Sequence, residues 1–212
     1  MIKVLNLYAG IGGNRKYWDN CKVTSVEYSP AIAKIYQDFY PNDTVVIGDA
    51  HEYLLNNYQN FDFIWASPPC QSHSRMIRGG RNRRPRYPDF KLYEEIFLLQ
   101  NWFDGQFVVE NVVPFYTPLI GCNHKIGRHM FWSNLDFTGI EEVKQPSNFI
   151  NLGTVAGSER LKKWLGLNYN GNIYYEGNHD PSQVLRNCVH TDLGKAIIDR
   201  FDTHFIPDIK IK

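Results

Sequence analysis

Strand-like and helix-like segments alternate along the first half of this chain, and that alternation restricts the fold more than any other feature. Each strand-like segment is a short apolar run rich in valine, isoleucine, leucine or phenylalanine. The runs lie at Lys3–Ala9, Lys22–Tyr28, Thr44–Asp49, Phe61–Ala66 and Phe107–Glu110. Strands separated by helices at this spacing form βαβ units, so the sequence predicts an α/β fold with a mostly parallel, doubly wound sheet.

Helices are expected in the gaps between these strands. The second has the clearest start, because Ser29 can cap it and Pro30 suits a first helical position. The expected helices run from Gly13 to Asp19, from Pro30 to about Tyr40, and from Leu92 to Trp102, with a further short helix that follows Asp49 and runs through Leu55.

Length and composition favour a single globular domain with a small insertion. The chain has 212 residues, of which 43% are hydrophobic and 15% aromatic. No stretch approaches the roughly 18 apolar residues of a membrane helix, and the first residues already read as a strand rather than a signal peptide. Four widely spaced cysteines fit free thiols in a reducing compartment, so we expect a cytoplasmic protein without a membrane segment.

Polar residues follow the predicted strands at the point where each strand ends. A ligand of an open parallel sheet binds beyond the carboxyl ends of the strands. The residues at those ends are the loop Ala9–Gly13, Glu27, Asp49, Cys70 and Glu110.

The first three strand ends suggest a nucleoside cofactor. The Gly-x-Gly-Gly of the first loop is weak evidence alone, since an ordinary tight turn has the same pattern. Glu27, however, can accept both hydroxyls of a ribose, and Asp49 can accept from an adenine amine. No Gly-x-x-x-x-Gly-Lys phosphate loop follows the first strand. These features fit S-adenosyl-L-methionine best, and the histidine spacing does not suggest a metal site.

The last two strand ends carry a cysteine and a glutamate. Cys70 follows two prolines in the segment Ser67–Ser74, and Glu110 closes the next strand. A lone cysteine at a strand end is usually inert core, but the neighbouring Glu110 favours catalysis. A thiol and a carboxyl side by side can add a nucleophile to an electron-poor ring and protonate that ring. The other three cysteines are interpreted as structural.

An arginine-rich segment begins just after Cys70. It holds six of the eleven arginines and no acidic residue before Asp89. Such a run is often only a solvated loop, but its position beside the candidate nucleophile favours phosphate contacts. The six are Arg75, Arg78, Arg81, Arg83, Arg84 and Arg86.

Four segments, in order, resemble motifs of the cytosine-C5 DNA methyltransferases. Leu5–Gly13 resembles the first cofactor motif, Pro68–Ser72 the catalytic-cysteine motif, Glu110–Val112 the catalytic-glutamate motif, and Gln183–Val189 the last motif. The match suggests a small member of the kind found in phages and restriction-modification systems. It implies a Rossmann-like methyltransferase fold and methyl transfer from S-adenosyl-L-methionine to a flipped cytosine, through a covalent bond between Cys70 and C6.

The resemblance also implies roles for individual residues. The catalytic residues would be Cys70, Glu110 and Arg128. The cofactor residues would be Tyr8, Ala9, Gly10, Ile11, Gly12, Gly13, Glu27, Tyr28, Asp49, Ala50, Pro69 and Asn187. The nucleic-acid contacts would be Gln71, Ser72, the six arginines of the loop and His129.

Two departures from the family pattern stand out. The family has two arginines where this chain has Gly127 and His129, with Arg128 between them, so either Arg128 or His129 would contact the base. Residues 135–180 are also fewer than the family usually uses to recognise its target. We therefore expect a catalytic and cofactor-binding domain of residues 1–134 together with 181–212, and a short target-recognition region of residues 135–180.

Three functions remain open from the sequence. The first is a DNA cytosine-C5 methyltransferase acting on duplex DNA, with a restriction enzyme or a second chain as a possible partner. The second is the same chemistry on RNA, such as tRNA. The third is a cofactor-binding accessory subunit without turnover, which the presence of both Cys70 and Glu110 argues against.

Overall fold

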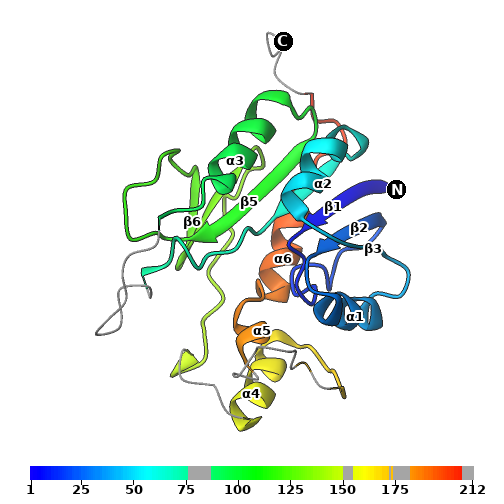
Figure 1. Cartoon of the computed structure of the whole chain (residues 1–212), viewed down its shortest axis with the longest axis vertical. Coiled ribbons are helices and arrows are strands. Elements are labelled where there is room, and N and C mark those ends of the chain that lie inside the picture. The colour runs from blue at the N-terminus through cyan, green and yellow to red at the C-terminus, as the bar shows by residue number, and fades with distance from the viewer. Residues whose placement is uncertain (76–86, 150–154, 172, 174–181, 207–212) are drawn as a thin grey trace.

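The structure is a computed structural model, and it describes residues 1–75, 87–149, 155–171, 173 and 182–206. Helices and strands alternate in the first half of the chain, as the sequence predicted (Figure 1). The strands are β1 (Ile2–Leu7), β2 (Cys21–Glu27), β3 (Thr44–Ile47), β4 (Phe63–Ala66), β5 (Gln106–Val112), β6 (His124–Ile126) and β7 (His129–Ser133). The helices are α1 (Pro30–Phe39), α2 (Ala50–Asn57), α3 (Lys91–Trp102), α4 (Val155–Leu165), α5 (Gln183–Arg186) and α6 (Thr191–Ile198), with a 3₁₀ turn, η1, at Tyr58–Asn60.

The strands of the described residues form one sheet in the order β3-β2-β1-β4-β5-β7-β6. β1 to β5 are mutually parallel, whereas β7 runs antiparallel to both of its neighbours, β5 and β6. This confirms the mostly parallel α/β sheet expected from the sequence. The order reverses at β1, so the switch point of the sheet lies between β1 and β4, where an open sheet binds its ligand.

Alternate residues of the central strands fill two apolar cores, one on each face of the sheet. Leu5, Leu7 and Ile64 pack on one face with residues of α2 and α3. Val4 and Trp65 pack on the other face with residues of α6. Because helices cover both faces, the strands are apolar almost throughout, and the polar groups are left to the strand ends.

A third apolar cluster joins the C-terminal helices to α1. Leu161 and Leu165 of α4 and Val184 of α5 pack with Ile32 of α1 and with Ile11. Figure 1 shows α4 and α5 together at one end of the molecule, next to α1. This cluster places the segment that begins at residue 183 against the loop that follows β1.

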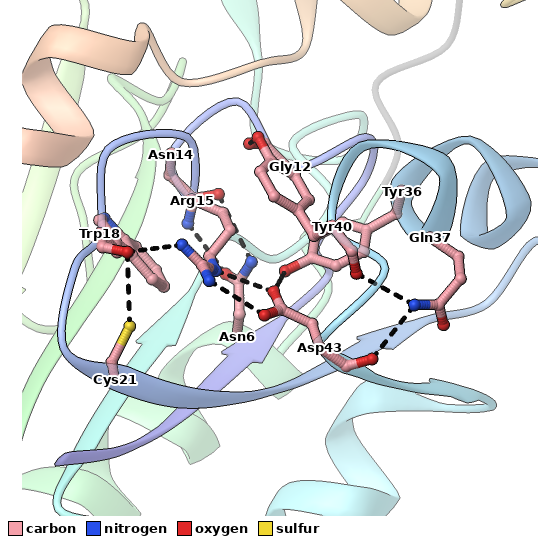
Figure 2. Close-up of polar contacts among 10 residues, drawn as sticks. All are labelled: Asn6, Gly12, Asn14, Arg15, Trp18, Cys21, Tyr36, Gln37, Tyr40 and Asp43. Atoms are coloured by element: carbon pink, nitrogen blue, oxygen red, sulfur yellow. Dashed lines mark hydrogen bonds and ion pairs between the residues drawn. The ribbon is translucent and has the colours of Figure 1, made fainter. Parts of the chain in front are cut away.

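The loop after β1 differs from the sequence-based expectation. We expected a helix from Gly13 to Asp19, but Gly13–Tyr17 form turns. The side chain of Asn14 donates to Asn6 Oδ1 at 2.8 Å, and Arg15 Nη1 donates to the carbonyl of Trp18 at 2.7 Å (Figure 2). Side chains that bond in this way stabilise a turn at the expense of a helix, so the helix prediction was wrong.

A buried network holds this loop against the end of α1 (Figure 2). Asp43 accepts two hydrogen bonds from Arg15, at 2.8 and 3.0 Å, and one from Tyr36 at 2.8 Å. Tyr40 donates to the carbonyl of Gly12 at 2.6 Å. Gly12 has φ +78°, and a Cβ there would lie 2.4 Å from a ring carbon of Tyr40. Both the backbone angle and the close approach therefore require glycine.

Within the described part of the chain, no helix is both long and apolar enough to span a membrane. The same residues contain no group of three or more histidine, cysteine or acidic side chains placed to hold a metal ion.

Candidate active site

One cavity of about 1160 Å³ opens beyond the carboxyl ends of the parallel strands. Its walls come from the loops after β1 and β4, the ends of β2, β3 and β5, the turn before β7, and the segment around α5. Among the residues singled out from the sequence, those lining it are Tyr8, Ala9, Gly10, Gly13, Glu27, Tyr28, Asp49, Ala50, Pro69, Cys70, Gln71, Glu110, Arg128, His129 and Asn187. Ile11 and Gly12 instead lie behind the wall, in the cluster with α1 and against the tyrosine rings.

Gly10 and Glu27 line the cavity beyond the ends of β1 and β2. Gly10 has φ +55°, and a Cβ added there would meet nothing within 4 Å, so its backbone is open to an approaching ligand. Glu27 accepts from the N–H groups of Gly10 at 3.0 Å and Ser29 at 2.9 Å. A carboxylate has about four acceptor positions, so Glu27 can still accept two hydroxyl groups.

Asp49 has a structural role that the sequence analysis did not foresee. Its Oδ1 caps α2 by accepting from His51 N–H at 2.8 Å, and its Oδ2 accepts from Lys91 Nζ at 3.1 Å. Burial raises the pKa of Asp49, but these hydrogen bonds outweigh it and the net pKa is lowered. Lys91 also lines the cavity, and its position at a helix start gave no sequence signal.

The last motif, Gln183–Val189, packs against the first motif, Leu5–Gly13. A Cβ at Gly13 would lie 2.6 Å from the carbonyl oxygen of Val189 and 2.8 Å from Cβ of Cys188. The absence of a side chain at Gly13 therefore lets the segment after α5 contact the loop after β1. This contact brings Asn187 into the cavity wall from a position more than 170 residues away in the sequence.

The loop that carries Cys70 is held by hydrogen bonds to its backbone carbonyl groups. Asn111 of β5 donates to the carbonyl of Pro68 at 3.0 Å. The carbonyl of Cys70 accepts from the N–H groups of His73 at 3.0 Å and Ser74 at 2.9 Å. His73 is itself buried, with its Nδ1 against the hydroxyl of Tyr116. Because β4 and β5 are adjacent parallel strands, this loop and Glu110 lie at the same edge of the sheet.

The Cys70 thiol lies in surroundings that favour its neutral form. Burial raises its pKa, and the carboxylate of Glu110 raises it further. The positive charge of Arg128 acts in the opposite direction but is the smaller effect. Cys70 is therefore a thiol at neutral pH.

Glu110 and His129 approach each other inside the cavity. His129 Nε2 lies 3.6 Å from Glu110 Oε1, and the two side chains are 20% and 10% exposed. Burial lowers the pKa of His129, although Glu110 opposes this shift. His129 is therefore a neutral imidazole at pH 7, able to donate one hydrogen bond.

Arg128 lines the cavity and is exposed. Its guanidinium stacks over the ring of Phe149 at 5.1 Å, and its Nη2 donates to the carbonyl of Arg186 at 3.4 Å. Phe149 and Arg186 line the cavity, and the sequence analysis assigned neither of them to the site. Both candidates for contacting the base thus line the cavity, His129 with a half-buried side chain and Arg128 with an exposed one.

The expected nucleic-acid contacts fall into three groups. Gln71 lines the cavity and is exposed. Ser72 and Arg75 are not among the residues that line it. Ser72 Oγ accepts from Asp89 N–H at 3.1 Å, and Arg75 Nε donates to the carbonyl of Pro114 at 3.2 Å. Arg78, Arg81, Arg83, Arg84 and Arg86 lie outside the described residues.

Comparison with known families assigns the chain to one of them. Residues 2–118, more than half of the chain, match the model of the C-5 cytosine-specific DNA methylase family. This chain belongs to that family. The cofactor of the family is S-adenosyl-L-methionine, which confirms the cofactor predicted from the sequence. No curated protein matches the chain.

Solved structures support the fold. A methyltransferase of Entamoeba histolytica, EhMeth, has a TM-score of 0.50 and 12% identity over 93% of this chain and 96% of its own. DNMT2 of Spodoptera frugiperda, solved as an E260A/E261A/K263A mutant, has 26% identity and a TM-score of 0.38 over 53% of this chain. That match spans only 36% of the DNMT2 chain. The first likeness confirms the Rossmann-like methyltransferase fold.

Proposed function

We propose that this chain is a DNA cytosine-C5 methyltransferase that uses S-adenosyl-L-methionine. The observation that carries the proposal is the shared cavity. Cys70 and Glu110 line one part of it, and Tyr8, Gly10 and Glu27 line another. We assign these residues as a nucleophile, an acid and a nucleoside-binding wall, which is the set of groups that methylation of a pyrimidine ring needs.

The cavity residues Gly10, Glu27, Asp49 and Asn187 fit S-adenosyl-L-methionine. The open backbone at Gly10 leaves space for it, and Glu27 offers free acceptor positions for the ribose hydroxyls. Asp49 would accept from the adenine amine, and Asn187 would close the site from the last motif. The bound cofactor supplies an electrophilic methyl group on a sulfonium.

The protein residues make the cytosine reactive. C5 of cytosine is a poor nucleophile, so the Cys70 thiolate first adds to C6 while Glu110 gives a proton to N3. The electrons of the former C5–C6 double bond then form a new bond from C5 to the methyl group. A base removes the C5 proton, the double bond re-forms, and Cys70 leaves C6 as a thiolate. N3 returns its proton to Glu110, so that the ring has gained one methyl group and lost one proton overall.

The target base must leave the helix, because C6 is not accessible in a stacked duplex. We propose that His129 or Arg128 donates to the flipped base. Gln71, Ser72 and the arginines between positions 75 and 86 would contact the nucleic acid. In this proposal, residues 135–180 recognise the target sequence, and residues 1–134 with 181–212 carry the cofactor and the chemistry.

A restriction enzyme or a second chain is the partner that such a short recognition region suggests. The four cysteines are free thiols in the structure, which supports a reducing compartment such as the cytoplasm.

Transfer of a tritiated methyl group to DNA and to tRNA, with and without RNase, tests the proposal. We expect RNase-resistant label in DNA and no label with the Cys70→Ser variant. Label that appears only in tRNA would make the protein an RNA methyltransferase. If neither substrate is labelled although the protein binds the cofactor, it would be an accessory subunit.

A further inference from the structure

A buried carboxylate, Glu95 of α3, lies behind the cofactor wall of the cavity and is fully shielded from solvent. Its Oε1 accepts from the hydroxyl of Tyr8 and lies 3.0 Å from His51 Nδ1. Its Oε2 has no hydrogen-bond partner among the described residues. The chemistry proposed above uses neither Glu95 nor His51.

This carboxylate connects three segments of the cavity wall. Tyr8 lines the cavity from the end of β1, and Asp49 and Ala50, which precede His51, line it from the start of α2. Lys91 and Leu92 line it from the start of α3, one turn before Glu95. The contacts of Glu95 with Tyr8 and His51 therefore fix the positions of all three segments from behind.

Tyr8 depends on this support more than an ordinary residue would. Its φ is +56°, in the left-handed region that non-glycine residues rarely adopt. Such a conformation persists where the surroundings hold it. The hydrogen bond to Glu95 anchors the far end of the tyrosine side chain and so fixes its ring in the cavity wall.

The surroundings of His51 favour the doubly protonated ring. Glu95 faces Nδ1 at 3.0 Å, and Glu94 faces Nε2 at 3.2 Å. A neutral imidazole has one N–H and cannot donate to both carboxylates. Hydrogen bonding to Glu95 raises the pKa of His51, against its burial and the more distant charge of Lys91. Burial raises the pKa of Glu95, and the hydrogen bonds from His51 and Tyr8 oppose that shift. The imidazolium is therefore the counter-ion that favours the ionised form of the buried Glu95.

We propose that Glu95 and His51 are positioning residues for the cofactor: the His51–Glu95 ion pair holds Tyr8 and the start of α2 in the geometry that binds S-adenosyl-L-methionine. This inference rests on the proposed function of the same cavity. It goes beyond that function in making cofactor affinity depend on the protonation of groups that do not touch the cofactor.

The direction of the pH dependence follows from the raised pKa of His51. His51 is fully protonated below the ordinary histidine pKa of about 6.5, and the ion pair is lost as pH rises through the higher pKa of His51 in the folded protein. Loss of that proton leaves Glu95 buried without a counter-ion and turns an Nε2 lone pair toward Glu94. Lys91, Asp49 and Tyr8 are the other charged or titratable groups nearby. Cofactor affinity should therefore fall as pH rises.

Two adjacent glutamates provide a matched test. Glu95→Gln removes the buried charge and keeps the shape, whereas Glu94→Gln does the same to a side chain that is 60% exposed. Calorimetry with S-adenosylhomocysteine, from about pH 6 to about pH 9, would compare both variants with the wild type. Titration of the ligand itself is common to all three proteins and cancels in the comparison.

For Glu95→Gln we expect the Kd at pH 7 to rise at least about fivefold, the size of a typical coupling between sites, and its pH dependence to be reduced. The Kd of Glu94→Gln should stay within about twofold of the wild type, because exposed ion pairs contribute little. In methyl transfer, Glu95→Gln should raise the cofactor KM and leave kcat at saturation unchanged, which a general loss of folding would not do. If Glu95→Gln does not fold, Tyr8→Phe, which removes only the hydroxyl, should give the same rise in Kd.

Equal affinities and equal pH profiles for the wild type and the folded Glu95 or Tyr8 variant would overturn the inference. Failure of the wild type to bind S-adenosylhomocysteine at all would count instead against the proposed function.

Discussion

At the scale of single residues, the cavity sets two requirements on Cys70 that conflict. In the proposed reaction Cys70 attacks as a thiolate, yet burial and the Glu110 carboxylate both raise its pKa. As a carboxylate, Glu110 disfavours the thiolate, whereas protonated Glu110, the form that would donate to N3 in the proposed reaction, does not. In the proposed reaction, thiolate formation is therefore linked to protonation of Glu110.

Removing the charge of Glu110 should consequently have opposite effects on two reactions of Cys70. In Glu110→Gln the thiol pKa should fall toward its ordinary value, so alkylation of Cys70 by iodoacetamide at a fixed pH near 8 should be faster than in the wild type. Methyl transfer by the same variant should be slower, because N3 is no longer protonated. Arg128→Gln is the control, with the opposite expected effect. Loss of the positive charge should raise the Cys70 pKa and so slow alkylation. Peptide mass spectrometry at Cys70 measures the rate, and an unchanged rate in both variants would contradict this account.

Glu27 is the residue expected to contribute most to cofactor affinity. Glu27→Ala should weaken binding of S-adenosyl-L-methionine by about 1.5–3 kcal/mol for each charge-assisted hydrogen bond lost. Asp49→Asn is the comparison, because asparagine still caps α2 and only one cofactor contact is weakened. Calorimetry should show the larger loss for Glu27→Ala. A loss confined to Asp49→Asn would mean that the ribose and adenine positions have been exchanged.

At the scale of elements, the sequence predicted those whose signals are local. Ser29 accepts from Ile32 N–H and caps α1 as expected, and the strand ends lie where the apolar runs stop. The helix expected after Gly13 failed because Asn14 and Arg15 bond to partners that the local pattern does not reveal. The sequence also could not predict the contact of Gly13 with Val189 or the hydrogen bond of Tyr8 with Glu95, since both join residues distant in sequence.

The loop after β1 should owe much of its stability to the ion pair of Arg15 with Asp43. Their side chains are 13% and 4% exposed, and removing one partner of a buried pair typically costs about 3–5 kcal/mol. Asp43→Asn should therefore lower the free energy of unfolding by about that amount in urea titrations. Asp199→Asn tests an exposed pair, with Lys195, and should cost less than about 1 kcal/mol. Equal losses for the two variants would show that the network in Figure 2 does not stabilise the loop.

The arginine-rich segment after Cys70 can be tested through its charge alone. If Arg81, Arg83 and Arg84 contact phosphates, neutralising all three should reduce the slope of log K against log salt by about 0.9 for each contact on duplex DNA. Methylation should slow on all sequences alike, because phosphate contacts carry no direct sequence information. A salt slope equal to that of the wild type would show that this segment is only a solvated loop.

At the scale of the whole molecule, the sheet brings groups from distant parts of the chain to one cavity. The first loop, the Cys70 loop, β5, the turn before β7 and the last motif all contribute to its wall. The family comparison covers residues 2–118, which include Cys70 and Glu110 but not Arg128, His129 or Asn187. For those three residues the structure adds a position in the cavity wall, and the roles of all five residues stay predictions.

The central claim is that Cys70 forms a covalent bond with a cytosine ring. Fluorine at C5 cannot leave as a proton does, so DNA containing such cytosines should trap the protein after methyl transfer. With S-adenosyl-L-methionine present, we predict a stable protein–DNA adduct whose modified peptide contains Cys70, and no adduct with Cys70→Ser. An adduct at Cys122 or Cys188, or one that persists in Cys70→Ser, would contradict the account.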